Sequence, residues 1–276
     1  MLWIVEWEDA VVSAPPLGFL FDLDGVFFVG DHAIAGGSET ISWLDAKEIP
    51  YLFVTNTTSH PRTYLVDKLA RCGVHTDPEQ ILTPAVAAHQ WLIEHDRGPV
   101  ALFVPDATAV EFGDLARLGP EGGSGVAAVV VGDLGEEWTF ETLNRAFRLL
   151  MHEPRPSLVA LGMARYWRDA DGLTLDNGPF VEALAFASGA EPVVTGKPAA
   201  AFFEAACERL GLAPRDVVMV GDDIRGDIGG ALDAGLRAVL VKTGKYHPGD
   251  LELDVEPEAV LASVADLEAW LASRET

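Results

Sequence analysis

Short runs of apolar residues alternate along this chain with longer segments in which apolar residues recur at helical spacing. The short runs predict strands over Gly18–Phe21, Tyr51–Thr55, Val100–Val104, Val126–Val131, Val217–Val220 and Ala238–Val241. The longer segments predict helices over Ser38–Lys47, Pro61–Cys72, Pro84–His95, Thr139–Met151, Ala199–Leu210 and Ser263–Ser273. Strands that alternate with helices build parallel βαβ units, so the pattern predicts an α/β fold with a doubly wound parallel sheet.

Polar residues follow several of these strands at the point where each strand ends. The segments are Asp22-Leu23-Asp24-Gly25, Thr55-Asn56 and Gly221-Asp222-Asp223 with Asp227, and Gly196-Lys197-Pro198 precedes a predicted helix. Right-handed crossovers gather the carboxyl ends of parallel strands on one edge of the sheet, where ligands bind. We therefore expect these segments to meet in a single site.

The spacing of the polar segments predicts a second domain. Between Asp24 and Thr55 there is room for a turn, one helix and one strand, whereas the chain between Thr55 and Lys197 has strands and helices of its own. If both ends serve one site, the middle is an inserted module that covers the site as a lid. We predict a first core segment over residues 1–82, an inserted α/β domain over 83–190 and a second core segment over 191–276.

Asp22 and Asp24 provide the first part of the expected chemistry. The Asp22 carboxylate ends an apolar strand and can attack phosphorus to form an aspartyl-phosphate, which splits one difficult step into two. Asp24 can protonate the leaving oxygen and then act as the base for the hydrolytic water, while Gly25 lets the chain turn sharply. The same Asp-x-Asp-Gly pattern opens calcium loops, but a calcium loop needs Glu where this chain has Ala33.

Thr55, Asn56 and Lys197 provide groups that can bind a phosphoryl group. The Thr55 hydroxyl and the Asn56 backbone N–H can donate to phosphoryl oxygens, although a helix cap is the alternative role for Thr55. Lys197 can neutralise phosphate and the nucleophilic carboxylate together, and its alternative role is that of a solvated lysine before a helix. It does not belong to a P-loop, because Glu191 stands at the first glycine position and Pro198 follows the lysine.

An acidic loop follows the strand at Val217–Val220 and predicts a hard-cation site. Mg2+ prefers oxygen ligands, usually one or two carboxylates with phosphate and water. Asp222 is the best candidate ligand, and Asp223 and Asp227 are either further ligands or partners of water and of Lys197. Several carboxylates around one point repel one another strongly without a cation. The alternative, a surface acidic loop, does not explain the buried strand that leads to it.

Composition and charge limit which binding partners and which cellular location we expect. The formal net charge of −24 repels phosphate backbones, so neither a nucleic acid nor an anionic membrane is an expected partner. The segment from Met1 to Asp9 is apolar at first but has no basic residue, so it predicts an extra strand or a loose tail rather than a secretory signal. Cys72 and Cys207 are expected to be reduced, which predicts a cytoplasmic protein.

Taken together, these motifs resemble the haloacid dehalogenase superfamily of phosphatases. Asp22 and Asp24 match its first motif, Thr55 its second, Lys197 its third and Asp222 to Asp227 its fourth, and the resemblance covers about residues 17 to 270. The resemblance implies a Rossmann-like core with a C2-type cap of subclass IIA inserted between the second and third motifs. It also implies that Asp22 is the nucleophile, that Asp24 is the acid and base, and that Mg2+ is held by Asp22, the Asp24 carbonyl and Asp222.

We expect a Mg2+-dependent phosphatase that acts on a small phosphorylated substrate (a phosphomonoester, pyrophosphate or a phosphoramidate) through Asp22. Two alternatives stay open: a phosphotransferase that uses an acceptor other than water, and a non-catalytic protein that binds Mg2+ and phosphate. The non-catalytic alternative predicts a missing nucleophile or acid, and neither Asp22 nor Asp24 is missing. A homo-oligomer formed through the inserted domain is compatible with the sequence, although no residue indicates one.

Overall fold

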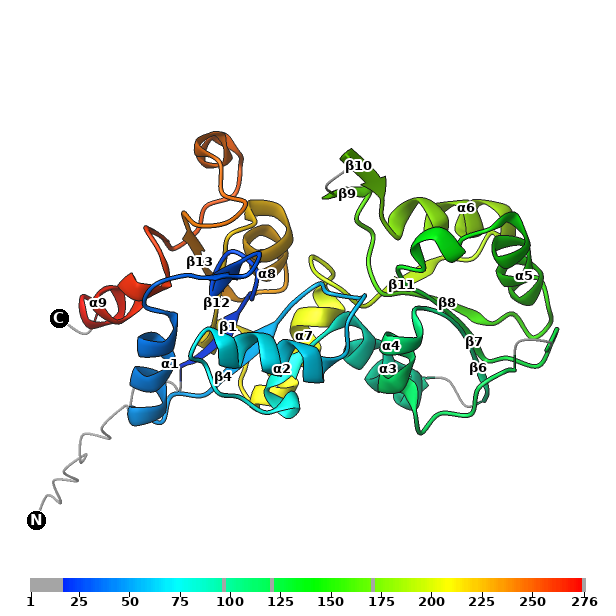
Figure 1. Cartoon of the computed structure of the whole chain (residues 1–276), viewed down its shortest axis with the longest axis horizontal. Helices are drawn as coiled ribbons and strands as arrows, with labels where there is room; N and C mark the ends of the chain where they lie inside the picture. Colours follow the sequence, from blue (N-terminus) through cyan, green and yellow to red (C-terminus); the bar gives the residue numbers. More distant parts are fainter. Residues whose placement is uncertain (1–16, 96–97, 120–121, 170–171, 275–276) are drawn as a thin grey trace, which may run out of the picture.

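The computed structural model describes residues 17–95, 98–119, 122–169 and 172–274. Within these residues the chain forms two separate parallel sheets with helices on both faces, and the two sheets lie side by side along the long axis of the molecule (Figure 1). The predicted α/β class with a doubly wound parallel sheet is confirmed. The N-terminal segment, for which the sequence predicts an extra strand or a tail, lies outside the described residues.

The larger sheet has six parallel strands in the order β14-β13-β12-β1-β4-β5. Their bounds are β1 (Gly18–Phe21), β4 (Tyr51–Val54), β5 (Ile81–Leu82), β12 (Val217–Gly221), β13 (Arg237–Val241) and β14 (Ala259–Leu261). At the centre of the sheet, Phe21 of β1 lies opposite Val220 of β12. The polar residues that follow these two strands therefore leave the sheet next to each other.

Both faces of this sheet are buried, which explains why its strands are apolar throughout instead of alternating with polar residues. In β1, for example, Phe19 and Phe21 belong to one core and Leu20 to the other. One face is covered by α1 (Gly37–Ala46), α2 (Arg62–Arg71) and α9 (Leu267–Ala272), and the other by α3 (Pro84–His95), α7 (Ala200–Leu210) and α8 (Gly230–Asp233).

The smaller sheet has four parallel strands in the order β11-β8-β7-β6. Its strands are β6 (Val100–Phe103), β7 (Ala128–Val131), β8 (Ser157–Ala160) and β11 (Pro192–Val194). Helices α5 (Phe140–Leu150) and α6 (Gly178–Ser188) pack on one face. Helix α3 and the turn η2 (Val110–Phe112), which follows the short helix α4 (Asp106–Ala109), cover the other.

Helix α3 joins the two sheets. Its residues Val86 and Ala87 pack into the core of the larger sheet, whereas Ala88 and Leu92 pack into the core of the smaller one. The chain reaches the smaller sheet through this helix and leaves it after β11, which pairs with β8. The predicted end of the inserted domain at residue 190 falls before this strand, so we propose that the inserted domain covers residues 83–194.

The six predicted strands and six predicted helices are present, and the last helix is preceded by a 3-10 turn, η7 (Val264–Asp266). Several short strands lie outside the prediction: β2 (Phe28–Val29), β3 (His32–Ala33), β5, β8, β11, β14 and the hairpin of β9 (Tyr166–Asp169) with β10 (Gly172–Leu175). Among the described residues, the unpredicted α-helices are α4, α6 and α8. The remaining short helices are the 3-10 helices η1 (Pro78–Gln80), η3 (Gly135–Glu137), η4 (Pro214–Asp216) and η6 (Pro248–Glu252) and the π-helix η5 (Ile224–Gly229).

One prediction drawn from composition can be compared with the fold. Cys72 and Cys207 are both free thiols, as expected. Among the described residues, no helix combines the length and the hydropathy needed to cross a bilayer.

Candidate active site

A buried cluster of charged side chains lies at the carboxyl edge of the larger sheet. Asp22 follows β1, Asp222 and Asp227 follow β12, and Lys197 lies between β11 and α7. Each of the four residues is at most 5% exposed. One carboxylate oxygen from each of the three aspartates lies within 4.8 Å of the others. The structure therefore brings together four of the residues that the sequence places in one site.

Lys197 links two of the three aspartates, Asp22 and Asp227. Its Nζ donates to Asp22 Oδ1 at 2.7 Å and lies 2.6 Å from Asp227 Oδ1. Burial acts to lower the pKa of this ammonium, but the two carboxylates outweigh burial and raise the pKa above its usual value. Lys197 is consequently a buried, permanently charged group, and the alternative of a solvated lysine is excluded.

Asn56 fixes the backbone of Lys197. Its side-chain Oδ1 accepts from the Lys197 N–H at 2.8 Å, and its Nδ2 donates to the Lys197 carbonyl at 2.8 Å. This pair of hydrogen bonds ties the end of β4 to the loop that carries the ammonium group. The sequence predicts a role for the Asn56 backbone N–H, and the structure adds this role for its side chain.

Thr55 lies at the end of β4 and is 3% exposed. Its hydroxyl is 3.0 Å from the Thr57 hydroxyl and accepts from the Thr57 N–H at 3.2 Å. Helix α2 begins at Arg62 after Pro61, with no side-chain cap. The alternative role of Thr55 as a helix cap is therefore excluded for this helix, and its hydroxyl lies in the same strand-end segment as Asn56.

The cluster carries an excess of negative charge. Burial and the neighbouring Asp22 and Asp227 carboxylates raise the pKa of Asp222 to about 7. Burial and Asp22 likewise raise the pKa of Asp227 to about 6, against the opposing effect of Lys197. Three carboxylates and one ammonium leave two uncompensated negative charges when all are ionised. A divalent cation would balance this excess.

One carboxylate oxygen is free to take a cation. Asp222 Oδ2 accepts from the Lys245 N–H at 2.5 Å, whereas Asp222 Oδ1 is buried and has no hydrogen-bond partner among the residues that the structure describes. A buried carboxylate oxygen without a partner is destabilising unless a ligand or water satisfies it. An all-oxygen donor set of this kind fits Mg2+.

Asp227 and Asp223 have other partners. Asp227 Oδ1 faces Lys197, and its Oδ2 accepts from the Asp223 N–H at 3.2 Å. Asp223 Oδ1 accepts from the N–H groups of Arg225 and Gly226 at the start of η5, at 3.0 and 2.9 Å. Burial acts to raise the pKa of Asp223, but these N–H donors and the Lys245 ammonium hold it below its usual value. Asp227 therefore positions Lys197, and Asp223 caps the acidic loop.

Asp24 lies on the open side of the cluster. Its side chain is 51% exposed, and its Oδ1 is 3.8 Å from Nζ of Lys68 on α2. The same ammonium lies 3.9 Å from the centroid of the Phe28 ring. Lys68 escaped the sequence analysis because a lysine on a helix normally indicates a solvated face, and only the pairing of α2 with the β1 loop shows its position.

A loop after β13 closes one side of the cluster and was also missed as part of the site. The Thr243 hydroxyl donates to the Gly25 carbonyl, and Gly244 has φ +61°. A Cβ at Gly244 would overlap Asp222 Oδ2 and Gly25 Cα, so the close approach requires glycine. The available signal was a Thr-Gly-Lys segment one residue after the end of an apolar strand.

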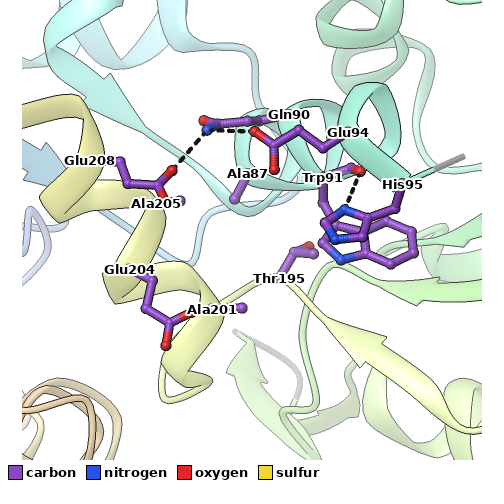
Figure 2. A pocket seen from close by; sticks show the side chains of 10 residues that line it. All are labelled: Ala87, Gln90, Trp91, Glu94, His95, Thr195, Ala201, Glu204, Ala205 and Glu208. Carbon is purple, nitrogen blue, oxygen red and sulfur yellow. Dashed lines mark hydrogen bonds between the residues drawn. The ribbon is translucent and has the colours of Figure 1, made fainter.

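A cavity of about 300 Å³ lies apart from this cluster, between α3 and α7 (Figure 2). Its walls include the carboxylates of Glu94, Glu204 and Glu208, and the Trp91 and His95 rings stack against each other at 4.7 Å. None of the four buried cluster residues lines it. This cavity is therefore separate from the candidate reaction site.

Comparisons with known proteins agree with this geometry. A family model described as haloacid dehalogenase-like hydrolase matches residues 19–115, and a second one, described as HAD-hydrolase-like, matches residues 194–267. The matched ranges contain the strands that end at Asp22 and Asp222 and exclude most of the inserted segment. The two matches thus cover most of the larger sheet and all four residues of its charged cluster, and the first match also extends into β6 of the smaller sheet.

Two curated relatives and one solved structure are similar over most of the chain. Phospholysine phosphohistidine inorganic pyrophosphate phosphatase of Homo sapiens is 37% identical over 237 residues, which cover 84% of this chain and 85% of that protein. Haloacid dehalogenase-like hydrolase domain-containing protein 2 of Bos taurus is 38% identical over 231 residues, 84% of this chain and 86% of that protein. The p-nitrophenyl phosphatase from Archaeoglobus fulgidus superposes with a TM-score of 0.82 at 26% identity, over 93% of this chain and 100% of that one.

Proposed function

Because this chain belongs to the haloacid dehalogenase-like hydrolases and is a phosphatase of that family, we propose that it hydrolyses a small phosphorylated substrate through an aspartyl-phosphate on Asp22, with Mg2+ as its cofactor. The observation that supports this proposal best is the buried Lys197 ammonium, 2.7 Å from Asp22 Oδ1 and 2.6 Å from Asp227 Oδ1, beside a third carboxylate with a free oxygen. This arrangement suits a carboxylate that meets an anionic phosphoryl group.

In the first step, Asp22 attacks phosphorus and the bond between phosphorus and the leaving group breaks. A carboxylate repels a phosphoryl anion, and the Lys197 ammonium offsets this repulsion because it lies against Asp22 and both side chains are buried. Asp24, on the open side of the cluster, donates a proton to the leaving oxygen. The Thr55 hydroxyl and the Asn56 backbone N–H are the proposed donors to phosphoryl oxygens.

In the second step, water attacks the phosphorus of the aspartyl-phosphate. Asp24, now ionised, accepts a proton from this water, phosphate leaves and the Asp22 carboxylate is regenerated. Asp24 can exchange protons with solvent between the two steps because half of its side chain is exposed. The chain therefore supplies the nucleophile, the acid and base, and one compensating positive charge.

The residues proposed to hold Mg2+ are Asp22, Asp222 and the Asp24 carbonyl. Asp222 offers its free Oδ1, whereas both oxygens of Asp227 are engaged, so we place Asp227 behind the metal as a partner of Lys197. When bound, Mg2+ neutralises charge on the nucleophile and on the phosphoryl oxygens. Asp223 is proposed to keep the loop in shape without contact to the metal.

The names of the similar proteins suggest which substrates to test. One relative is named for phospholysine, phosphohistidine and inorganic pyrophosphate, and one structural neighbour for p-nitrophenyl phosphate. We propose a small phosphoanhydride, phosphoramidate or phosphomonoester for this chain, and neither a nucleic acid nor a membrane as a partner. The two free thiols support a cytoplasmic location, and a homo-oligomer stays a prediction.

The direct test is phosphate release by the purified protein with Mg2+ or with EDTA, across pyrophosphate, phosphoramidate, p-nitrophenyl phosphate and a panel of sugar and nucleotide phosphates. We expect Mg2+-dependent release, and we expect Asp22→Asn to lower kcat by about 1,000-fold or more while the protein stays folded, since removal of a nucleophile has effects of this order. Wild-type activity in this variant would exclude the proposed mechanism.

The same experiment separates the alternatives. Consumption of substrate with transfer of phosphoryl to an added alcohol or amine, instead of release as phosphate, would indicate a phosphotransferase. Metal-dependent binding of phosphate without turnover of any substrate would indicate a non-catalytic protein.

A further inference from the structure

The loop that follows β13 is fixed against the catalytic cluster at three points. The Thr243 hydroxyl donates to the Gly25 carbonyl, Gly244 lies against Asp222, and the Lys245 N–H donates to Asp222 Oδ2 at 2.5 Å. The backbone of Lys245 is thereby held directly beside a residue of the cluster. Its side chain starts from a defined position at the rim of the site.

The Lys245 ammonium faces the cluster from the solvent side. Its side chain is 66% exposed, and its Nζ lies 3.6 Å from Asp223 Oδ2. Burial acts to lower the pKa of this ammonium, but the carboxylates of Asp22, Asp223, Asp227 and Asp222, in decreasing order of effect, raise it above its usual value. Lys245 is therefore charged at neutral pH and within electrostatic reach of the nucleophile.

Lys245 differs from the other lysines of the site in the exposure of its side chain to solvent. Lys197 is 3% exposed in its side chain and contacts two carboxylates, and Lys68 is 15% exposed and lies between Asp24 and the Phe28 ring. These two and Lys245 are three of only five lysines in a chain with a net charge of −24. Such a concentration of positive charge in an acidic protein favours an anionic ligand at this position.

The position of Lys245 also indicates which part of the ligand it meets. Lys197 lies against Asp22 at the bottom of the site, where the transferred phosphoryl group must bind. Lys245 pairs with Asp223, whose side chain is 35% exposed, farther toward solvent. A group bonded to the transferred phosphoryl on its outer side would replace water around the Lys245 ammonium.

We propose that Lys245 is a specificity residue that binds a second anionic group on the leaving-group side of the substrate, so that the enzyme prefers substrates with a charged leaving group. This inference rests on the proposed function for the position of the transferred phosphoryl. Lys245 donates to the oxygens of the second group, and Asp223 keeps the ammonium pointed at the site in the absence of substrate. Charge-assisted hydrogen bonds of this kind are among the stronger ones in proteins.

The test compares Lys245→Gln with the wild type on two substrates that differ in the charge of the leaving group. In intact pyrophosphate the group bonded to the transferred phosphoryl is a second, anionic phosphate, whereas in intact p-nitrophenyl phosphate it is an uncharged nitrophenyl ring. We expect the ratio of kcat/KM for pyrophosphate to kcat/KM for p-nitrophenyl phosphate to fall by about tenfold or more in Lys245→Gln, mainly through KM, as expected for the loss of one charged contact. Lys245→Arg should restore most of the ratio because it restores the charge.

Lys242→Gln is the matched control, because Lys242 is an exposed lysine of the same loop. Lys242 has no ion pair within 4.0 Å among the described residues, whereas Lys245 has one. The ratio should stay at the wild-type value in this variant. An equal loss on both substrates in Lys245→Gln would show a general structural or catalytic role and would overturn the inference. An unchanged ratio would overturn it as well.

A binding measurement separates this inference from the proposed function. Calorimetry with excess Mg2+ compares methylenediphosphonate, which has a second anionic group, with methylphosphonate, which has none. We expect the wild type to prefer the diphosphonate and Lys245→Gln to lose about tenfold of that preference. If Lys245→Gln loses the preference for the diphosphonate but the wild type turns over no substrate, only the proposed function is refuted. Turnover that depends on Asp22, with an unchanged or absent preference, would refute only the role of Lys245.

Discussion

The two carboxylate oxygens of Asp222 differ in their surroundings. Its Oδ2 accepts from the Lys245 N–H, and its Oδ1 is buried with no hydrogen-bond partner in the described part of the chain. The side chain can approach the loop after β13 so closely because glycines occupy positions 25 and 244, where a Cβ would overlap the carboxylate. At the scale of single residues, the glycines are therefore as necessary for the geometry of the site as the acids.

Gly244→Ala tests this requirement. The new Cβ must displace Asp222 Oδ2 or the Gly25 backbone, so we expect a fall in kcat/KM of about tenfold or more and weaker Mg2+ binding, measured by a Mg2+ titration of activity and of the thermal midpoint. Gly30→Ala is the matched control, since Gly30 has a similar φ of +58° but no atom of the described residues lies within 4 Å of the added Cβ. If both variants lose activity equally, backbone strain and not the contact with Asp222 explains the effect.

At the scale of elements, the sequence indicates strands that lead to the site better than it indicates the elements around it. The strands before Asp22 and Asp222 are buried on both faces, and their continuous apolar runs are visible in the sequence. The two-residue strand β5 is too short to show a period. Helix α6 escaped because Gly178 and Pro179 resemble a loop and because its residues are apolar on most sides.

In the site, too, some residues could be predicted from the sequence and others could not. Asp22, Asp222 and Asp227 could be found because each follows an apolar strand, and Lys197 because lysine is rare in this chain. The partners that hold them could not be found. The contacts of the Asn56 side chain with Lys197 join residues 141 positions apart, and only the folded chain brings them together.

One contact between elements predicts a measurable effect on stability. Glu111 of η2 accepts from the backbone N–H of Arg62 at 3.1 Å and from its Nε at 3.0 Å, and thus joins the inserted segment to the start of α2. Its side chain is only 9% exposed. We expect Glu111→Ala to lower the free energy of unfolding by about 2 kcal/mol, as for the loss of a largely buried charged hydrogen bond, measured by urea denaturation.

Arg215→Ala serves as the control for Glu111→Ala. Arg215 pairs with Asp216 at 3.9 Å, and its side chain is 85% exposed. Removal of such an exposed pair should change stability by less than about 0.5 kcal/mol. Equal effects of the two substitutions would mean that the Arg62 contact does not stabilise the junction between the two sheets.

At the scale of the whole molecule, the chain is strongly acidic, and its buried lysine lies in the charged cluster. The net charge is −24, yet the cluster at the end of the larger sheet is built around the buried Lys197 and retains an excess of only two negative charges. Helix α3 contributes to the cores of both sheets, so the two sheets are coupled mechanically as well as through the chain. A cation bound to the cluster should consequently stabilise the larger sheet and, through α3, the molecule.

This coupling predicts that stabilisation by Mg2+ depends on pH. The pKa values of about 7 for Asp222 and about 6 for Asp227 in the metal-free protein lie above the value near 3.9 of an unfolded aspartate. The folded state therefore binds more protons than the unfolded state between these values, and its stability falls as pH rises from about 4 to about 7.

Mg2+ binds the ionised carboxylates and removes this penalty, so the gain in thermal midpoint on replacing EDTA with Mg2+ should be larger at about pH 8 than at about pH 5. Asp222→Asn should lose most of the gain, and a gain that is the same at both pH values would show that these carboxylates do not hold the metal.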